Sequence, residues 1–137
     1  MNDLTPAAQQ ALAAFQDCRQ WEQRARLLLQ WAAQLDELPE ALRSDEHLVH
    51  GCETKVWLVL EQQAEQVSFR MASEARLLRG LLALLLVRIE GLTAEQIAAV
   101  DITEWFTQLG LSRQLSPSRS NGLNAVLQKM QALLKQN

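Results

Sequence analysis

Apolar residues recur at helical spacing through the first quarter of the chain. Thr5 followed by Pro6 is typical of a helix start, because the threonine hydroxyl caps the first turn and proline fits its first position. A second helix is predicted over residues 20–35, where apolar positions repeat every three to four residues. It ends before Pro39, since proline disfavours helix at the residue that precedes it. Two consecutive helices are therefore expected.

The helical pattern then gives way to a period of two. Residues 42–51 are polar, which predicts a loop with a short strand near Leu48. Residues 56–60 are apolar at every position, so this predicted strand should be covered on both faces. A turn at residues 63–65 leads into the alternating residues 67–72, which predict a half-exposed strand. The two strands form an antiparallel hairpin that helices or a third strand must cover.

The most apolar stretch predicts a central helix over residues 74–90, capped by Ser73. A glycine inside a helix costs about 1 kcal/mol relative to alanine, so Gly80 indicates close backbone packing there. Capping patterns predict three further helices. They start at Thr93, Asp101 and Ser116-Pro117. This order predicts a single α+β domain over residues 1–137, with a small antiparallel β-sheet of two to three strands packed against several α-helices.

Length and charge narrow the class of protein. The 137 residues, 48% of them hydrophobic, suffice for one domain with a packed core. The net charge of −3 argues against a nucleic-acid partner and gives no attraction to an anionic membrane. The first residues lack the basic and apolar regions of a signal peptide, and the longest apolar run is far shorter than a bilayer span. We expect a soluble, cytoplasmic protein.

Cys52 is the residue with the clearest chemical potential. It follows Gly51 and precedes the first predicted strand, a junction at which a rigid scaffold can present a side chain. A thiolate is the nucleophilic form of cysteine, so nearby His50 and Lys55 would assist its formation and Glu53 would oppose it. The alternative is a buried, inert cysteine, since free cysteines often lie in cores.

Cys18 and the two histidines allow few other kinds of functional site. Cys18 is expected at the core or its boundary, at the end of the first helix. A zinc site would need His47 and His50 to join both cysteines, and the chain has no CxxC pair, so zinc is disfavoured. Two rivals stay open: a Cys–His hydrolase built on Cys52, and an interaction module in which Cys52 is structural.

Two segments give the chain a family resemblance. The run HGCETKVWL, residues 50–58, resembles the active-cysteine segment of the SufE family of sulfur acceptors, which includes CsdE. The run LSPSRSNGL, residues 115–123, resembles the second signature of that family. Three shorter matches follow the same order along the chain: Trp21-Glu22, Gly80-Leu81-Leu82-Ala83 and Trp105-Phe106. The resemblance therefore covers nearly the whole sequence.

This resemblance implies a sulfur carrier. Cys52 would accept sulfur from a cysteine desulfurase as a persulfide, stimulate that enzyme, and pass the sulfur on for iron–sulfur cluster assembly. No metal or cofactor is implied on this chain, because pyridoxal phosphate belongs to the desulfurase. Arg119 matches the signature arginine and is expected near the Cys52 loop, while His50, Gly51 and Glu53 are supporting candidates.

The resemblance does not separate the SufE branch from the CsdE branch. A SufS-like and a CsdA-like desulfurase are therefore both candidate partners, as is an iron–sulfur scaffold that receives the sulfur. A second copy of the chain is a further candidate partner. The family's acceptor cysteine sits on a loop that is tucked against apolar surface until the partner binds, which would protect a persulfide from water and oxidants.

Overall fold

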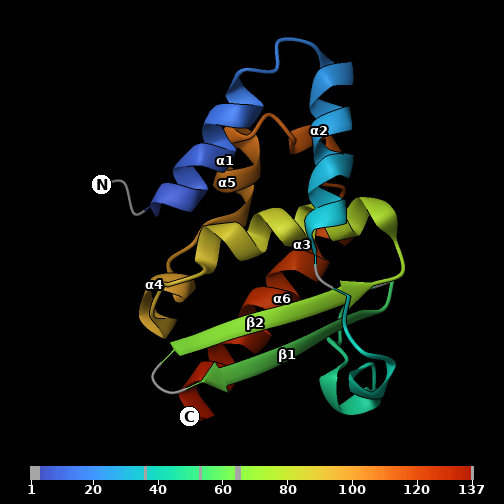
Figure 1. The fold of residues 1–137 in the computed structure, drawn as a ribbon, viewed down its shortest axis with the longest axis vertical. Coiled ribbons are helices and arrows are strands. Elements are labelled where there is room, and N and C mark those ends of the chain that lie inside the picture. The colour runs from blue at the N-terminus through green and yellow to red at the C-terminus, as the bar shows by residue number, and fades with distance from the viewer. Residues whose placement is uncertain (1–3, 36, 53, 64–65, 137) are drawn as a thin grey trace.

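The structure is a computed structural model that describes residues 4–35, 37–52, 54–63 and 66–136. In this part of the chain, six α-helices pack with one two-stranded antiparallel sheet that lies toward one end of the molecule, the α+β class predicted from the sequence (Figure 1). The helices are α1 (Pro6–Gln16), α2 (Trp21–Gln34), α3 (Arg76–Ile89), α4 (Ala94–Ala98), α5 (Ile102–Gln108) and α6 (Pro117–Gln136). The strands are β1 (Val56–Gln63) and β2 (Gln66–Ser73). Short 3₁₀ turns, η1 (Glu40–Leu42), η2 (Asp45–His47) and η3 (Ser112–Gln114), lie between them.

Side-chain caps explain where most helices begin. At four of the predicted starts, a hydroxyl or carboxylate oxygen accepts a hydrogen bond from a backbone N–H of the first turn, which would otherwise lack a partner. The pairs are Thr5 with Ala8, Thr93 with Gln96, Asp101 with Glu104, and Ser116 with Arg119. The predicted starts of these four helices are confirmed.

The start of α3 differs from the prediction. Ser73 does not cap it; this residue is the last of β2 and pairs with Val56, while the N-cap is Ala75. The Ser73 hydroxyl instead accepts a hydrogen bond from the Ala75 N–H at 3.3 Å, so it stabilises the turn between strand and helix. The β-ladder therefore continues further than the period-two pattern indicated, and α3 begins at Arg76.

The hairpin is longer than predicted. β1 continues through Gln63, which pairs with Gln66, so Gln63 belongs to the strand and not to the turn. The rest of the predicted turn, residues 64–65, lies outside the described residues. Val56 and Leu58 join the main core, as the apolar pattern of this strand predicted.

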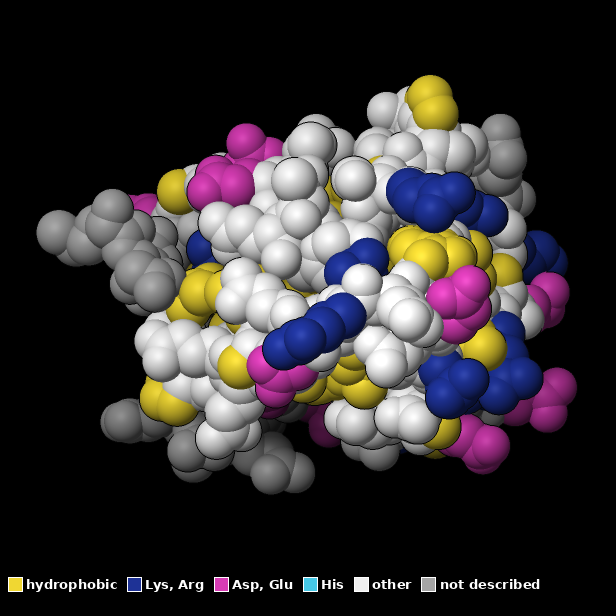
Figure 2. Space-filling model, turned by 90° about the horizontal axis from the view of Figure 1, so that it is seen from above, with side chains coloured by type: hydrophobic (Ala, Val, Ile, Leu, Met, Phe, Trp, Pro, Cys, Tyr) yellow, Lys and Arg dark blue, Asp and Glu magenta, His cyan; other side chains and the backbone are white. Residues whose placement is uncertain are grey.

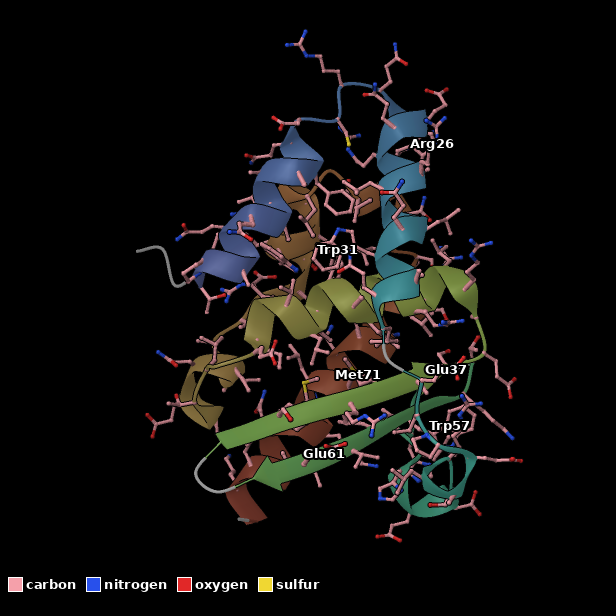
Figure 3. The ribbon with its side chains drawn as sticks, viewed as in Figure 1. Arg26, Trp31, Glu37, Trp57, Glu61 and Met71 are labelled. Carbon is pink, nitrogen blue, oxygen red and sulfur yellow. The ribbon has the colours of Figure 1, made fainter. Side chains whose placement is uncertain are left out.

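The other face of the sheet is covered as well. Trp57 and Val59 form a second apolar cluster with Leu38 and Ala72, beside the segment between α2 and β1 (Figure 3). Coverage on both faces of β1 is thus confirmed. β2 is more enclosed than expected, because Ala72 is buried in this cluster and only 7% exposed.

The central helix is α3, and α2 packs along it. A Cβ built on Gly80 would lie 2.6 Å from the main-chain oxygen of Leu28 in α2, so the two helices approach more closely than a side chain permits. The close packing predicted at Gly80 is confirmed. In Figure 1, α6 lies behind the sheet, where it contacts β1 and α3. The hairpin is therefore held between α6 and the segment that precedes β1.

The surface mixes both charge signs. On the face that Figure 2 shows, basic and acidic side chains are interspersed, with apolar patches between them. No helix in the described ranges is long and apolar enough to cross a bilayer.

Candidate functional site

Cys52 lies in a short loop that is closed at its base by strand β1. The Val49 N–H donates to the Val56 oxygen at 2.8 Å, and Leu48 forms a single β-bridge with Trp57. Instead of the short strand predicted near Leu48, the described residues there form this single bridge. Residues 50–52 and 54–55 thus lie in a loop that begins and ends at this paired base, and Cys52 lies near its middle.

Gly51 gives the loop a conformation that other residues rarely adopt. Its φ is +101°, in the left-handed region where a Cβ clashes with the backbone. A Cβ at Gly51 would also lie 3.4 Å from the Cβ of Ala125 in α6. The glycine therefore serves both the turn and the contact with α6.

The thiol of Cys52 rests on the N-terminal part of α6. Its S–H donates to the main-chain oxygen of Gly122 at 3.5 Å, and the side chain is half-buried. A Cβ on Gly122 would lie 3.2 Å from the Cys52 sulfur, closer than most side-chain contacts. The absence of a side chain at Gly122 thus lets the thiol sit against the helix.

A cleft of about 190 Å³ opens beside this thiol. It is built from three separate elements: the Cys52 loop, α3 and the start of α6. Its lining residues are Cys52, Thr54, Leu78, Ser116, Ser118, Arg119 and Gly122. Arg119 donates from Nη1 to the main-chain oxygen of Gln114 at 3.1 Å, which fixes the guanidinium at the cleft. Arg119 and Cys52, expected to be neighbours, therefore line the same cleft.

The surroundings of the Cys52 thiol, where it rests against Gly122, favour its neutral form. Burial raises the pKa of Cys52 above its ordinary value, because partial removal from water penalises the thiolate. The Gly122 oxygen accepts a hydrogen bond from the S–H and offers nothing to a thiolate. In this conformation Cys52 is consequently a weak nucleophile at neutral pH.

Within the part of the chain that the structure describes, neither histidine is hydrogen-bonded to Cys52, whose S–H donates to Gly122. His47 Nδ1 is 3.0 Å from the Leu42 oxygen and 3.3 Å from Ser44 Oγ, so the ring is engaged in its own turn. His50 is exposed, and among the described residues the cleft is lined by neither histidine. The geometry for a Cys–His dyad is not assembled here. Glu53, the other supporting candidate, lies outside the described residues.

The remaining thiol and the metal-ligand side chains form no second site. Cys18 is half-buried after the end of α1 and donates to the Ala14 oxygen at 3.6 Å, as expected of a boundary residue. Across the residues that the structure describes, no three His, Cys, Asp or Glu side chains gather in a way that would hold a metal ion.

The sequence did not single out Thr54 and Leu78, which line the cleft, or Lys129 of α6, which binds the segment before the Cys52 loop. The Lys129 Nζ donates to the main-chain oxygens of Leu48, at 3.0 Å, and Glu46, at 3.4 Å. Both oxygens belong to the segment that leads into the Cys52 loop. The available signal is the spacing of Gly122, Ala125 and Lys129, which places two small residues and a lysine on one helical face.

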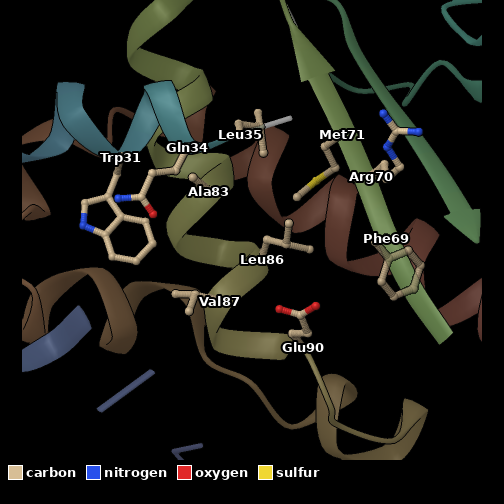
Figure 4. A pocket seen from close by; sticks show the side chains of 10 residues that line it. All are labelled: Trp31, Gln34, Leu35, Phe69, Arg70, Met71, Ala83, Leu86, Val87 and Glu90. Carbon is tan, nitrogen blue, oxygen red and sulfur yellow. The ribbon is translucent and has the colours of Figure 1, made fainter. Parts of the chain in front are cut away.

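A second hollow, of about 250 Å³, shares no lining residue with the Cys52 cleft. Figure 4 shows Trp31 of α2 on one side and Phe69 and Met71 of β2 on the other, with Leu86 of α3 between them. Its walls are mostly apolar and carry no nucleophile. The candidate chemistry of the described residues therefore centres on Cys52.

Comparisons with known proteins bear on the family and the fold of this chain. The family model SufE, described as an Fe-S metabolism associated domain, matches residues 9–134, a stretch that includes the Cys52 loop and most of α6. A solution structure of a hypothetical protein from Thermus thermophilus is similar in fold, with a TM-score of 0.75 and 25% sequence identity. That similarity covers 97% of this chain and 96% of the other.

Proposed function

This chain belongs to the SufE family of Fe-S metabolism associated domains, and from this membership we propose that Cys52 carries sulfur from a cysteine desulfurase toward iron–sulfur cluster assembly. The observation that carries the proposal is the half-buried thiol in a cleft that it shares with Arg119. The cleft supplies a nucleophile and a cation, without an orienting base for hydrolysis among its described lining residues.

The proposed reaction needs only sulfur chemistry. The Cys52 thiolate attacks the outer sulfur of a persulfide on the desulfurase, a new S–S bond forms at Cys52, and the old S–S bond breaks. The desulfurase cysteine leaves as a thiolate, so the step conserves both atoms and electrons, as in thiol–disulfide exchange. We propose that the chain needs no metal or cofactor of its own, and that pyridoxal phosphate is held by the desulfurase.

Arg119 is the residue that we propose to assist the carried sulfur. The outer sulfur of a persulfide is anionic when deprotonated, and a guanidinium in the same cleft attracts it. A guanidinium has five N–H donors, so Arg119 can keep its bond to the Gln114 oxygen while another nitrogen faces the cleft. The hydroxyls of Ser116 and Ser118 line the same space and add donors.

The raised pKa of Cys52 fits a carrier whose thiol has low reactivity until a partner binds. A protonated, half-buried thiol reacts slowly with small electrophiles and oxidants. We propose that docking of a SufS-like or CsdA-like desulfurase moves the thiol into an environment in which it ionises, and that the partner's turnover is thereby stimulated. We propose that this sulfur transfer takes place in the reducing cytoplasm, where Cys52 stays a free thiol between transfers.

The test is to incubate the protein with a cysteine desulfurase, pyridoxal phosphate and cysteine, and then to measure its intact mass. We expect a gain of about one sulfur atom that a reducing agent removes, the mark of a persulfide. Cys18→Ser is the matched control, because it removes the other half-buried thiol and should still gain sulfur. A gain that persists in Cys52→Ser, or no gain at all, contradicts the proposal.

A further inference from the structure

The Cys52 loop follows one face of α6 in a fixed register. Leu48 accepts a hydrogen bond from Lys129, Gly51 faces the Cβ of Ala125, and Cys52 rests on Gly122. As the loop advances along the sequence, its partners on α6 step backward toward the start of the helix. The loop therefore runs antiparallel to α6, with a hydrogen bond at each end and Ala125 beside Gly51 in the middle.

The lengths of the two segments agree with this register. From Gly122 to Lys129 the helix advances by about 10.5 Å, at about 1.5 Å per residue. The loop from Leu48 to Cys52 can span at most about 13 Å when fully extended. The helix and loop segments are therefore of comparable length. A shift of one end of the loop along α6 would displace the contact at the other end.

Lys129 makes the strongest of these contacts. Its ammonium group donates to the oxygens of both Leu48 and Glu46, and charge-assisted hydrogen bonds are about twice as strong as neutral ones. At the other end the Cys52 S–H is a weak donor, and in the middle Gly51 meets only a methyl group. The hydrogen bond from Val49 to Val56 holds the loop to β1, but it does not fix its position along α6.

We propose that Lys129 is a positioning residue that fixes the Cys52 loop in register along α6 and thereby keeps the thiol seated on Gly122. The consequence for sulfur transfer rests on the proposed function, because the seating of Cys52 matters to a partner only if that thiol receives sulfur. The positioning role itself does not depend on a desulfurase.

The test compares the alkylation rates of the two cysteines by iodoacetamide, measured separately by peptide mass spectrometry at one fixed pH. In Lys129→Met both hydrogen bonds to the segment before the Cys52 loop are lost, and we expect Cys52 to react about tenfold faster or more, the change expected on loss of hydrogen bonds from a charged group. Cys18 should keep its rate, because it lies near α1 and reports any general loosening of the fold. Lys129→Arg should restore a slow rate, since a guanidinium also donates to backbone oxygens.

The sign of the change separates positioning from a charge effect. Loss of a nearby positive charge disfavours the thiolate, so a purely electrostatic role of Lys129 predicts slower alkylation of Cys52. Lys135→Met removes the same charge from an exposed position of α6 and should leave both rates unchanged. An unchanged or slower rate at Cys52, or an equal acceleration of Cys18, would overturn the proposal. No desulfurase is present, so this failure is distinct from a failure of sulfur transfer.

Discussion

The Cys52 sulfur lies 3.5 Å from the main-chain oxygen of Gly122, a contact between positions seventy residues apart in the sequence. It joins the loop before β1 to the first turns of α6 and closes one side of the cleft. Gly122 is the residue that makes the contact possible, because a side chain would occupy the space that the thiol now fills.

Gly122→Ala should disturb the thiol without unfolding the protein. The new Cβ would lie 3.2 Å from the Cys52 sulfur, so the thiol must move away by a few tenths of an ångström. Alanine is favoured over glycine inside a helix by about 1 kcal/mol, so the free energy of unfolding should stay within about that amount of the native value. Faster alkylation of Cys52 together with an unchanged thermal midpoint is the expected pair of results. Gln128→Ala, an exposed substitution on the same helix, serves as control. Equal alkylation rates of Cys52 in both variants would argue against the contact between the thiol and Gly122.

Gly80→Ala should have the opposite effect on stability. Its Cβ would lie 2.6 Å from the Leu28 oxygen, which belongs to a helix backbone and cannot move as a side chain does. We expect a loss of about 1–3 kcal/mol in the free energy of unfolding, as for other overpacked cores, despite the better helix propensity of alanine. Urea unfolding measures the change. A urea midpoint of Gly80→Ala at or above that of the native protein would show that α2 and α3 can move apart without loss of stability.

The reactivity of Cys52 should depend on pH in a defined direction. Burial raises its pKa, so the folded protein holds the thiol proton to a higher pH than the unfolded chain does. The pH midpoint for alkylation of Cys52 should lie higher in the native protein than in the same protein in urea. By linkage, the stability that the neutral thiol contributes is complete below the unfolded pKa and is lost as the pH rises through the folded pKa. A native midpoint below the unfolded one would mean that a cation, and not burial, governs this thiol.

Local patterns in the sequence predict the elements well, because helix spacing, alternation and caps are short-range signals. They fail at Ser73, where a capping residue and the end of a strand look alike and only the pairing with Val56 decides. Cys52 and Arg119 are singled out by the family resemblance, and their shared cleft becomes visible only in the fold. The spacing of Lys129 from Ala125 places both on one face of α6, but the hydrogen-bond partner Leu48 is 81 residues away and is identified only in the fold.

Arg119→Met should slow sulfur acceptance by Cys52. Loss of a charge-assisted contact to the incoming sulfur should lower the transfer rate about tenfold. Added salt should lower the rate of the native protein toward that of the variant. Arg113→Met is the matched control, because Arg113 lies over the Trp21 ring and does not line the cleft. Single-turnover mixing with a desulfurase gives both rates. Equal rates in the two variants would remove Arg119 from the proposed site.

The most direct test of the account follows one sulfur atom between two proteins. A cysteine desulfurase is loaded as its persulfide, freed of cysteine and mixed with this chain, and the intact masses of both proteins are then measured. If Cys52 carries sulfur, the desulfurase loses one sulfur atom and this chain gains one on Cys52. The transfer should persist in Cys18→Ser and vanish in Cys52→Ser. Sulfur that stays on the desulfurase, or that reaches the Cys52→Ser variant, would contradict the account.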